Sequence, residues 1–214
     1  MNKKAVIFDM DGVIIDSEPF WQHAQQTSLA NYGVSVTIEE CMKYTMGKRA
    51  DEIADIWCER YSLEVPPKFL EKSTISCLRK LIAAHGQPMK GLHNALDFFK
   101  RNNMTIALAT SSNHSIINSV FNKLGLWNHF SIIRSAEDEE FGKPHPGVYL
   151  TTAKELGLPT NECLVIEDSF NGMKAAKAAD METHLVSSQC HEEKFIVANG
   201  KYRDLDELVE KLTA

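Results

Sequence analysis

The sequence lacks the features of membrane and secreted proteins. No hydrophobic run approaches the roughly 20 residues that a membrane-spanning helix needs. Four apolar residues separate Met1-Asn2-Lys3-Lys4 from Asp9, too few for the core of a signal peptide. The five cysteines are odd in number and form no C-x-x-C pair or Cys/His cluster, so neither disulfide bonds nor a zinc site is expected. We therefore expect a cytoplasmic protein with free thiols.

An excess of positive charge is also missing. The 214 residues include 23 lysines and arginines against 29 aspartates and glutamates, which gives a formal net charge of -6. So acidic a chain has no general attraction to nucleic acid or to anionic membranes, and we expect neither as a partner. A phosphate site therefore has to be built locally, from a metal ion, a lysine and backbone N–H groups. A monomer is the default expectation.

What the chain does have is a series of short apolar runs, each followed by polar residues. The runs are 5–8, 105–109, 130–133, 163–166 and 183–186. Continuous apolar runs of this length are typical of strands buried on both faces of a parallel sheet. Helical patterns at 93–102, 115–124, 147–156 and 171–179 alternate with them, and a last helix is expected at 204–212. This order predicts an α/β fold with a doubly wound, Rossmann-like parallel sheet.

The alternation breaks between residues 18 and 84, where no strand is expected. Four helical stretches occur there, at 18–32, 38–44, 50–61 and 68–84, and glycines and prolines separate them. We interpret residues 17–86 as an all-helical cap domain inserted into a catalytic core formed by 1–16 and 87–214. The chain is expected to cross between the two domains near Ile15–Ser17 and near Gly86–Lys90.

Chemically active side chains follow the predicted strands at the point where each strand ends. Ligands bind at this edge of an open α/β sheet, so residues distant in sequence can meet there. Asp9 and Asp11 follow the first strand, and Gly12 permits a tight turn. Such carboxylates suit Mg²⁺ binding or nucleophilic attack, and the alternative is a plain Asp-Gly turn. A calcium-binding loop is excluded because apolar residues such as Val13 occupy required ligand positions.

Hydroxyl-bearing residues follow the second strand. The run Thr110, Ser111, Ser112, Asn113 stands between that strand and the next predicted helix. Hydroxyl and free N–H groups at such a junction bind phosphate well. Serine and asparagine are also favoured helix caps, so capping is the alternative interpretation of this run.

Charged residues follow two later strands. Lys143 lies in the sequence Gly142-Lys-Pro, where its charge can neutralise a phosphate or a phosphorylated aspartate. An isolated lysine is otherwise most often a surface residue. Glu167 and Asp168 are adjacent acids that repel each other unless a cation such as Mg²⁺ lies nearby, and a helix cap is their alternative. Capping does not easily explain why all four groups occur, in this order, at four strand ends.

The four groups resemble the four motifs of the haloacid dehalogenase superfamily: D-x-D-G from Asp9, T-S-S from Thr110, G-K-P from Gly142 and E-D-S-x-x-G from Glu167. Within it, the run from Asp9 to Glu18 resembles the β-phosphoglucomutase-like branch, which carries its helical cap between the first two motifs. The chain is most similar to its sugar-phosphate phosphatases of the 2-deoxyglucose-6-phosphatase type. The resemblance implies Mg²⁺-dependent hydrolysis of small phosphorylated metabolites, such as hexose, deoxyhexose or sugar-alcohol 6-phosphates, through an aspartyl-phosphate.

The resemblance also implies roles for individual residues. Asp9 is the expected nucleophile, and Asp11 is expected to protonate the leaving oxygen and then to activate water. The Asp9 side chain, the Asp11 backbone carbonyl and Asp168 are expected to hold Mg²⁺, with Glu167 in or near the coordination shell. The residues expected to bind the phosphoryl group are Thr110, Ser111, Ser112, Asn113 and Lys143.

Single residues distinguish this chain from relatives with other activities. The family's dehalogenases and phosphonate-cleaving enzymes lack an acid at the position of Asp11, which favours phosphate esters here. A phosphosugar mutase is the main alternative, because the mutase resembles this chain at Arg49. The mutase has a cap histidine where this chain has Trp21, and this difference favours hydrolysis. Trp21, Lys48 and Arg49 are expected to select the substrate, unless they form a packed aromatic and a solvated turn. A non-catalytic phosphate-binding module is the second alternative.

Overall fold

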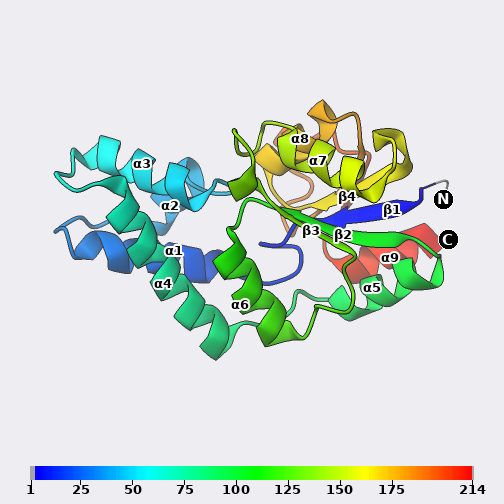
Figure 1. Ribbon diagram of the computed structural model, residues 1–214, viewed down its shortest axis with the longest axis horizontal. Coiled ribbons are helices and arrows are strands. Elements are labelled where there is room, and N and C mark those ends of the chain that lie inside the picture. The colour runs from blue at the N-terminus through cyan, green and yellow to red at the C-terminus, as the bar shows by residue number, and fades with distance from the viewer. Residues whose placement is uncertain (1–2, 214) are drawn as a thin grey trace.

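The computed structural model describes residues 3–213 and shows a sheet covered by helices, with a helical segment extending to one side (Figure 1). The two ends of the chain lie far from that segment. Met1, Asn2 and Ala214, which are the ends of the predicted core, lie outside the described residues. None of the helices in the described range has an apolar stretch long enough to cross a membrane. The five cysteines are free, as the sequence predicts.

The sheet is parallel and has the strand order β3-β2-β1-β4-β5-β6. The strands are β1 (Ala5–Phe8), β2 (Thr105–Thr110), β3 (Ile132–Ser135), β4 (Cys163–Glu167), β5 (Glu182–Val186) and β6 (Gly200–Tyr202). From β1, the strands β2 and β3 are added on one side of the sheet, and β4, β5 and β6 are added on the other. The order of the strands therefore reverses at β1, and ligands bind at the carboxyl ends of the strands at such a point. The predicted doubly wound α/β fold is confirmed.

Helices cover both faces of the sheet. They are α5 (Leu92–Arg101), α6 (His114–Leu124), α7 (Gly147–Leu156), α8 (Phe170–Ala178) and α9 (Leu205–Thr213), with single 3-10 turns at Ala136–Asp138, Thr160–Glu162 and Glu193–Phe195. Alternate residues of β1 face opposite layers: Val6 and Phe8 pack with α5, α6 and α9, whereas Ala5 and Ile7 pack with α7 and α8. Burial on both sides explains why the strand has no polar residue.

Two details of the sheet differ from the prediction. The third strand was expected at 130–133 but spans Ile132–Ser135, because Phe130 packs its ring against Phe8 and Phe121 from the loop before the strand. The edge strand β6, Gly200–Tyr202, was not predicted. It has three residues and no continuous apolar run, because an edge strand is only half buried.

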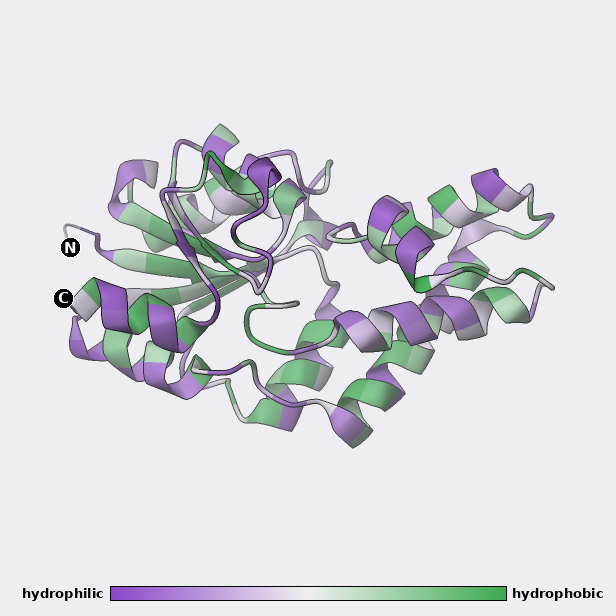
Figure 2. Ribbon diagram, turned by 180° about the vertical axis from the view of Figure 1, so that it is seen from behind, coloured by the Kyte–Doolittle hydropathy of each residue, from purple (hydrophilic) through white to green (hydrophobic). Residues whose placement is uncertain are grey.

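The helical segment consists of α1 (Glu18–Ala30), α2 (Ile38–Tyr44), α3 (Ala50–Tyr61) and α4 (Pro67–His85). Along these helices, hydrophobic residues are interspersed with hydrophilic ones (Figure 2). This pattern is typical of amphipathic helices, which bury one face and expose the other. The long helix α4 packs against α1 and α3 and also against α6 of the core. The chain leaves and re-enters the core side by side, since the Met89 N–H donates to the Ile14 carbonyl at 2.9 Å.

Candidate active site

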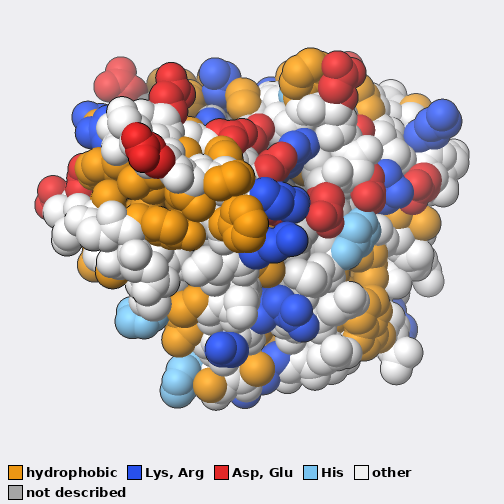
Figure 3. All heavy atoms as spheres, turned by 60° about the vertical axis from the view of Figure 1, so that its left-hand side comes forward, with side chains coloured by type: hydrophobic (Ala, Val, Ile, Leu, Met, Phe, Trp, Pro, Cys, Tyr) orange, Lys and Arg blue, Asp and Glu red, His pale blue; other side chains and the backbone are white. Residues whose placement is uncertain are grey.

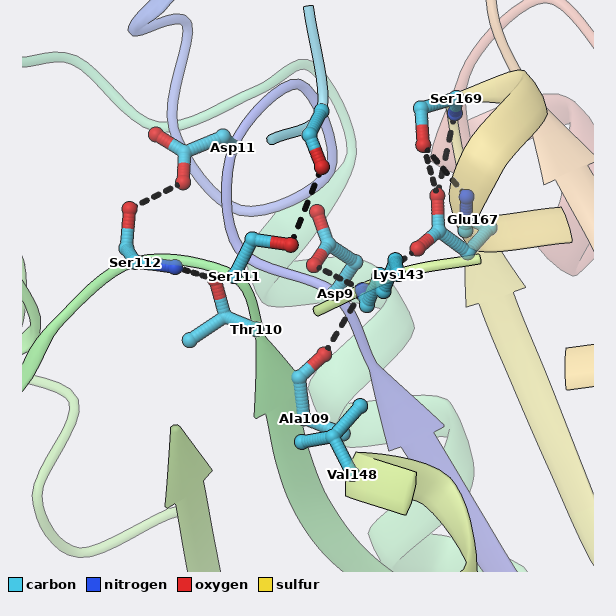
Figure 4. A network of polar contacts seen from close by, with 12 residues as sticks. Asp9, Asp11, Ala109, Thr110, Ser111, Ser112, Lys143, Val148, Glu167 and Ser169 are labelled. Atoms are coloured by element: carbon cyan, nitrogen blue, oxygen red, sulfur yellow. Dashed lines mark hydrogen bonds and ion pairs between the residues drawn. The ribbon is translucent and has the colours of Figure 1, made fainter. Parts of the chain in front are cut away.

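Residues from four strand ends and from the helical segment meet in one pocket. Core residues include Asp9 after β1, Thr110 at the end of β2, Lys143 after β3 and Asp168 after β4, and Figure 4 shows several of them pointing toward one another. The remaining lining residues are Asp11, Glu18, Trp21, Gln25, Thr45, Met46, Gly47, Lys48, Ile53, Ser111, Ser112 and Ser169. The parallel sheet therefore brings together side chains that are up to about 160 residues apart, as expected for this fold.

Lys143 lies at the centre of the core side of the pocket. Its ammonium group donates to Asp9 Oδ1 at 2.7 Å, to Glu167 Oε1 at 2.6 Å and to the Ala109 carbonyl at 3.1 Å. The side chain is buried, and burial alone would lower its pKa. Attraction to Asp9 and Glu167 outweighs burial and holds the pKa of Lys143 well above its usual value. The lysine is therefore a fixed positive charge beside Asp9.

Glu167 uses both carboxylate oxygens to hold neighbouring groups. Oε1 accepts hydrogen bonds from Lys143 and from the Tyr149 hydroxyl at 2.7 Å. Oε2 accepts from the N–H groups of Asp168 and Ser169 and from the Ser169 hydroxyl. A Cβ atom at Gly172 would lie 1.7 Å from Oε1, which explains the glycine of the fourth motif. Burial opposes ionisation, but Lys143 and these donors lower the pKa of Glu167.

The acidic groups of the pocket outnumber its cations. Oxygens of Asp9, Glu167 and Asp168 lie within 4.8 Å of one another. Burial, opposed by Lys143 and reinforced by Glu167 and Asp11, raises the pKa of Asp9 to about 7. Burial and the same acidic neighbours raise the pKa of Asp168 well above its usual value. Among described residues, no donor contacts Asp9 Oδ2 or the Asp168 carboxylate.

This arrangement suits a divalent cation. Carboxylates without donors, held close together at a strand end, match the oxygen ligands that Mg²⁺ prefers. Gly12 has a φ of +76°, and a Cβ atom there would lie 2.1 Å from Asp168 Oδ2, so glycine lets the two loops approach each other. Asp9 and Asp168 fit the metal better than Glu167, since donors already occupy both Glu167 oxygens.

Asp11 is held by three donors. Its Oδ2 accepts a hydrogen bond from the Ser112 hydroxyl at 2.7 Å, and its Oδ1 accepts from the Ser17 hydroxyl at 2.5 Å and from Trp21 Nε1 at 2.9 Å. Asp11 lies beyond the strand, so its direction does not follow the alternation of β1. The side chain instead takes its direction from these hydrogen bonds.

The predicted phosphate-binding run divides into different environments. Thr110 Oγ1 accepts from the Ser112 N–H, and the Ser111 hydroxyl donates to the Gly47 carbonyl at 3.1 Å, which links the core to the loop after α2. Asn113 caps α6 by accepting from the Ile116 N–H and does not line the pocket. Thr110, Ser111 and Ser112 line the pocket.

The predicted residues of the helical segment also divide. Trp21 and Lys48 line the pocket. Arg49 does not: its guanidinium donates to the carbonyls of Ala136 and Glu139 at 3.1 and 3.0 Å and pairs with Asp51. In this state Arg49 fastens the loop after α2 to the core and offers no charge to the pocket.

Some pocket residues were missed by the sequence analysis. Glu18 lines the pocket and Ser17 contacts Asp11, and both belong to the stretch that carries the family resemblance, so they had a signal. Tyr149 contacts Glu167 from within α7, where an amphipathic pattern cannot distinguish a buried hydroxyl with a functional partner from an ordinary core residue.

Basic side chains, with acidic ones among them, gather near the middle of the face shown in Figure 3. Two grooves near the contact of the helical segment with the core are lined by Arg49, Lys68, Lys72 and Arg79, together with Glu71 and Glu137. One of these grooves shares Ser111 with the pocket. With Asp51 also lining one of the grooves, the acidic chain thus has a local surface of mixed charge next to the pocket.

Comparison with known proteins agrees with this geometry. The chain is 33% identical over 210 residues to hexitol phosphatase B of Escherichia coli (strain K12), covering 97% of this chain and 95% of the relative. It is 30% identical to a phosphorylated carbohydrates phosphatase of Thermotoga maritima, covering 84% and 82%. Its fold matches a β-phosphoglucomutase of Clostridium difficile with a TM-score of 0.83 at 27% identity, covering 99% and 96%. The model of the haloacid dehalogenase-like hydrolases matches residues 6–186, and the chain belongs to this family.

Proposed function

We propose that the protein is a Mg²⁺-dependent phosphatase of small phosphorylated metabolites that works through an aspartyl-phosphate on Asp9. It is a phosphoric monoester hydrolase, the class to which its phosphatase relatives belong. The single observation that carries the mechanism is the state of Asp9, which lines the pocket: Oδ1 is bound to Lys143, whereas Oδ2 has no donor from the described residues. A fixed cation beside a free carboxylate oxygen suits nucleophilic attack on a phosphate.

In the first step, Asp9 attacks phosphorus while the bond from phosphorus to the ester oxygen breaks. Asp11 gives its proton to the leaving oxygen, which departs as an alcohol. Lys143 balances negative charge on the transferring group, and the Ser111 hydroxyl, which lines the pocket, is proposed to contact its oxygens, while the Ser112 hydroxyl stays on Asp11. Bound between Asp9, the Asp11 carbonyl and Asp168, Mg²⁺ would supply the charge that a dianionic substrate needs in this acidic pocket.

In the second step, water attacks the phosphorus of the aspartyl-phosphate. Asp11, now a carboxylate, takes a proton from this water, and phosphate leaves as Asp9 is restored. General acid–base assistance of this kind contributes roughly 10²–10⁴-fold to the rate. Glu167 has no direct part, because it spends its oxygens on Lys143, Tyr149 and the loop before α8.

Residues 17–86 are proposed to act as a cap that opens to admit the substrate. The cavity between this segment and the core is about 40 Å³, which has room for only a few water molecules. A sugar phosphate is much larger, so the helical segment has to move away and return. Ser111 to Gly47 and Arg49 to Ala136 are polar contacts that break in this motion.

The proposed substrates are hexose, deoxyhexose or sugar-alcohol 6-phosphates. Support comes from the relatives named as phosphatases of hexitols and of phosphorylated carbohydrates. The test is phosphate release from a panel that includes glucitol 6-phosphate, 2-deoxyglucose 6-phosphate and 4-nitrophenyl phosphate, with Mg²⁺ and with EDTA. The proposal expects turnover that needs Mg²⁺ and is fastest with a sugar or sugar-alcohol phosphate. Absence of release from every compound contradicts it.

A phosphosugar mutase is the second candidate, favoured by the 27% identity to a solved β-phosphoglucomutase. Trp21 stands against it, because an indole cannot take over the proton chemistry of the mutase histidine. Incubation with β-glucose 1-phosphate distinguishes the two. Release of phosphate without glucose 6-phosphate supports hydrolysis, whereas efficient conversion to glucose 6-phosphate establishes the mutase.

A further inference from the structure

Asp11 receives hydrogen bonds from both parts of the molecule. The core supplies Ser112 to Oδ2, whereas Ser17 and Trp21, at the start of the helical segment, supply two donors to Oδ1. The direction of the proposed acid–base group therefore depends on where α1 lies. A residue of the helical segment that lines the pocket need not contact the sugar to affect catalysis.

Ser17 and Trp21 form one unit on one face of α1. They are four residues apart, and the backbone N–H of Trp21 donates to the backbone carbonyl of Ser17 at 2.9 Å. Ser17 occupies the N-cap of α1, where a serine side chain usually bonds the first turn and stabilises the helix. Its side chain makes no such bond here. Its hydroxyl contacts Asp11 instead, so the helix gives up a cap to orient this carboxylate.

Trp21 has the chemistry of a positioning group. Its side chain is buried, with 8% of its surface exposed, and its one polar atom is engaged by Asp11. An indole N–H donates a hydrogen bond but neither accepts one nor exchanges its proton with a carboxylate. It therefore fixes the carboxylate without competing for the proton that Asp11 transfers. A histidine at this position would titrate and accept hydrogen bonds.

We propose that Trp21, assisted by Ser17, is a positioning residue that holds Asp11 for proton transfer to the leaving oxygen, and that it does not select the sugar. This inference rests on the proposed phosphatase function. It assigns to the helical segment a part in the chemical step, which comes into place only when α1 lies against the core.

The leaving group provides the test. Benzyl phosphate and 4-nitrophenyl phosphate have similar size and neither has a sugar. Benzyl alcohol needs a proton to leave, whereas 4-nitrophenolate leaves without one. Because kcat/KM reports steps up to departure of the alcohol, Trp21→Phe is expected to lower kcat/KM for benzyl phosphate about tenfold or more. The value for 4-nitrophenyl phosphate is expected to change less than about twofold, because its leaving group needs no acid.

Trp57→Phe is the matched control. Trp57 is also buried in the helical segment and donates its indole N–H at 2.8 Å, but to Gln25 and not to Asp11. This variant loses a buried indole hydrogen bond and is expected to change both kcat/KM values by the same factor. Where thermal melting shows that Trp21→Phe is unfolded, Ser17→Ala takes its place, since it removes the other donor to Oδ1 and is expected to give the same selective loss.

Two outcomes overturn the inference while leaving the proposed function intact. If Trp21→Phe and Ser17→Ala each lower kcat/KM equally for benzyl phosphate and 4-nitrophenyl phosphate, the two residues have only a structural role. A loss confined to glucitol 6-phosphate, with benzyl phosphate unaffected, indicates that Trp21 selects the sugar. A wild-type protein that hydrolyses none of the three compounds in Mg²⁺ contradicts the proposed function itself, and the inference with it.

Discussion

The two sides of the pocket differ in how tightly their charged groups are held. On the core side, Asp9, Lys143 and Glu167 are at most 6% exposed, and they share one network of hydrogen bonds. On the helical side, Glu18 and Lys48 are half-exposed, and Lys48 has no ion pair among the described residues. The comparison suggests that strand ends hold the charged reacting groups, whereas the helical segment orients Asp11 through Ser17 and Trp21 and contributes Lys48 to substrate binding.

The largest effect is expected on the core side at Asp9. Asp9→Asn removes the nucleophile while keeping its size, so Mg²⁺-dependent phosphate release should be abolished. Far-ultraviolet circular dichroism should show an intact fold, because the side chain contributes no apolar packing. Full activity in this variant would sink the assignment of Asp9.

Lys143 tests how strongly the core network depends on its cation. Lys143→Met leaves Glu167 and Asp9 buried without a counter-charge, and breaking such a pair costs about 3–5 kcal/mol of stability. Lys68→Met is the matched change in the helical segment. Lys68 pairs with Glu71, but 66% of its side chain is exposed, so the loss should stay below about 1 kcal/mol.

Urea unfolding of both variants measures this difference, and phosphate release accompanies it. Loss of activity in Lys143→Met with normal activity in Lys68→Met sharpens the contrast between the two sides. Equal stability losses would break it, since they would place the two ion pairs in similar environments.

Mg²⁺ should bind more weakly as the pH falls below about 7. In the metal-free protein, burial raises the pKa of Asp9 from 3.8 to about 7, so the folded state holds a proton that the unfolded state has lost. The resulting stability is fully present below pH 3.8 and disappears as the pH rises through 7. Mg²⁺ requires the carboxylate, so it must displace this proton at low pH.

Thermal melting with and without Mg²⁺ at pH 6 and pH 8 checks this expectation. At a hundredfold excess over its dissociation constant the metal stabilises by about 2.7 kcal/mol, and this excess is reached at a lower Mg²⁺ concentration at pH 8. Asp9→Asn should reduce the pH dependence, and the part that remains is expected from Asp168, whose pKa burial also raises. Stronger stabilisation at pH 6 in the wild type would contradict the raised pKa.

The smallest effect is expected on the helical side at Lys48. Lys48→Ala should raise KM for a sugar phosphate a few-fold, because a charge that is half-exposed to solvent contributes about 1 kcal/mol or less. Its kcat for 4-nitrophenyl phosphate should stay unchanged. Lys80→Ala, at an exposed lysine of the helical segment that does not line the pocket, is the control and should change neither value. A large loss of kcat in Lys48→Ala would instead indicate that Lys48 takes part in the chemical step.

More of the core side of the pocket than of the helical side could be predicted from the sequence. Buried strands reveal themselves as apolar runs, and the parallel sheet then forces Asp9, Lys143 and Asp168 to one edge. The fold class followed from the same pattern, whereas the strand order came from the structure. Strand β6 was not predicted, because a three-residue edge strand needs no apolar run.

On the helical side, the sequence pattern indicates residue types but not the directions in which their side chains point. Lys48 and Arg49 are adjacent and basic, yet one lines the pocket and the other bonds to carbonyls of the core. Asn113 directly follows Ser111 and Ser112, which line the pocket, but Asn113 itself caps α6. Such choices depend on loop geometry and on distant partners such as Ala136, which local pattern does not encode.

The most direct test of the account is to look for phosphate on Asp9. The protein is mixed with Mg²⁺ and a rapidly hydrolysed phosphate ester, quenched in acid within one turnover, and its peptides are analysed by mass spectrometry after borohydride reduction. The account predicts that Asp9, and no other aspartate, carries the phosphoryl group and appears as homoserine after reduction. Substrate turnover with unmodified Asp9 at every quench time would contradict it.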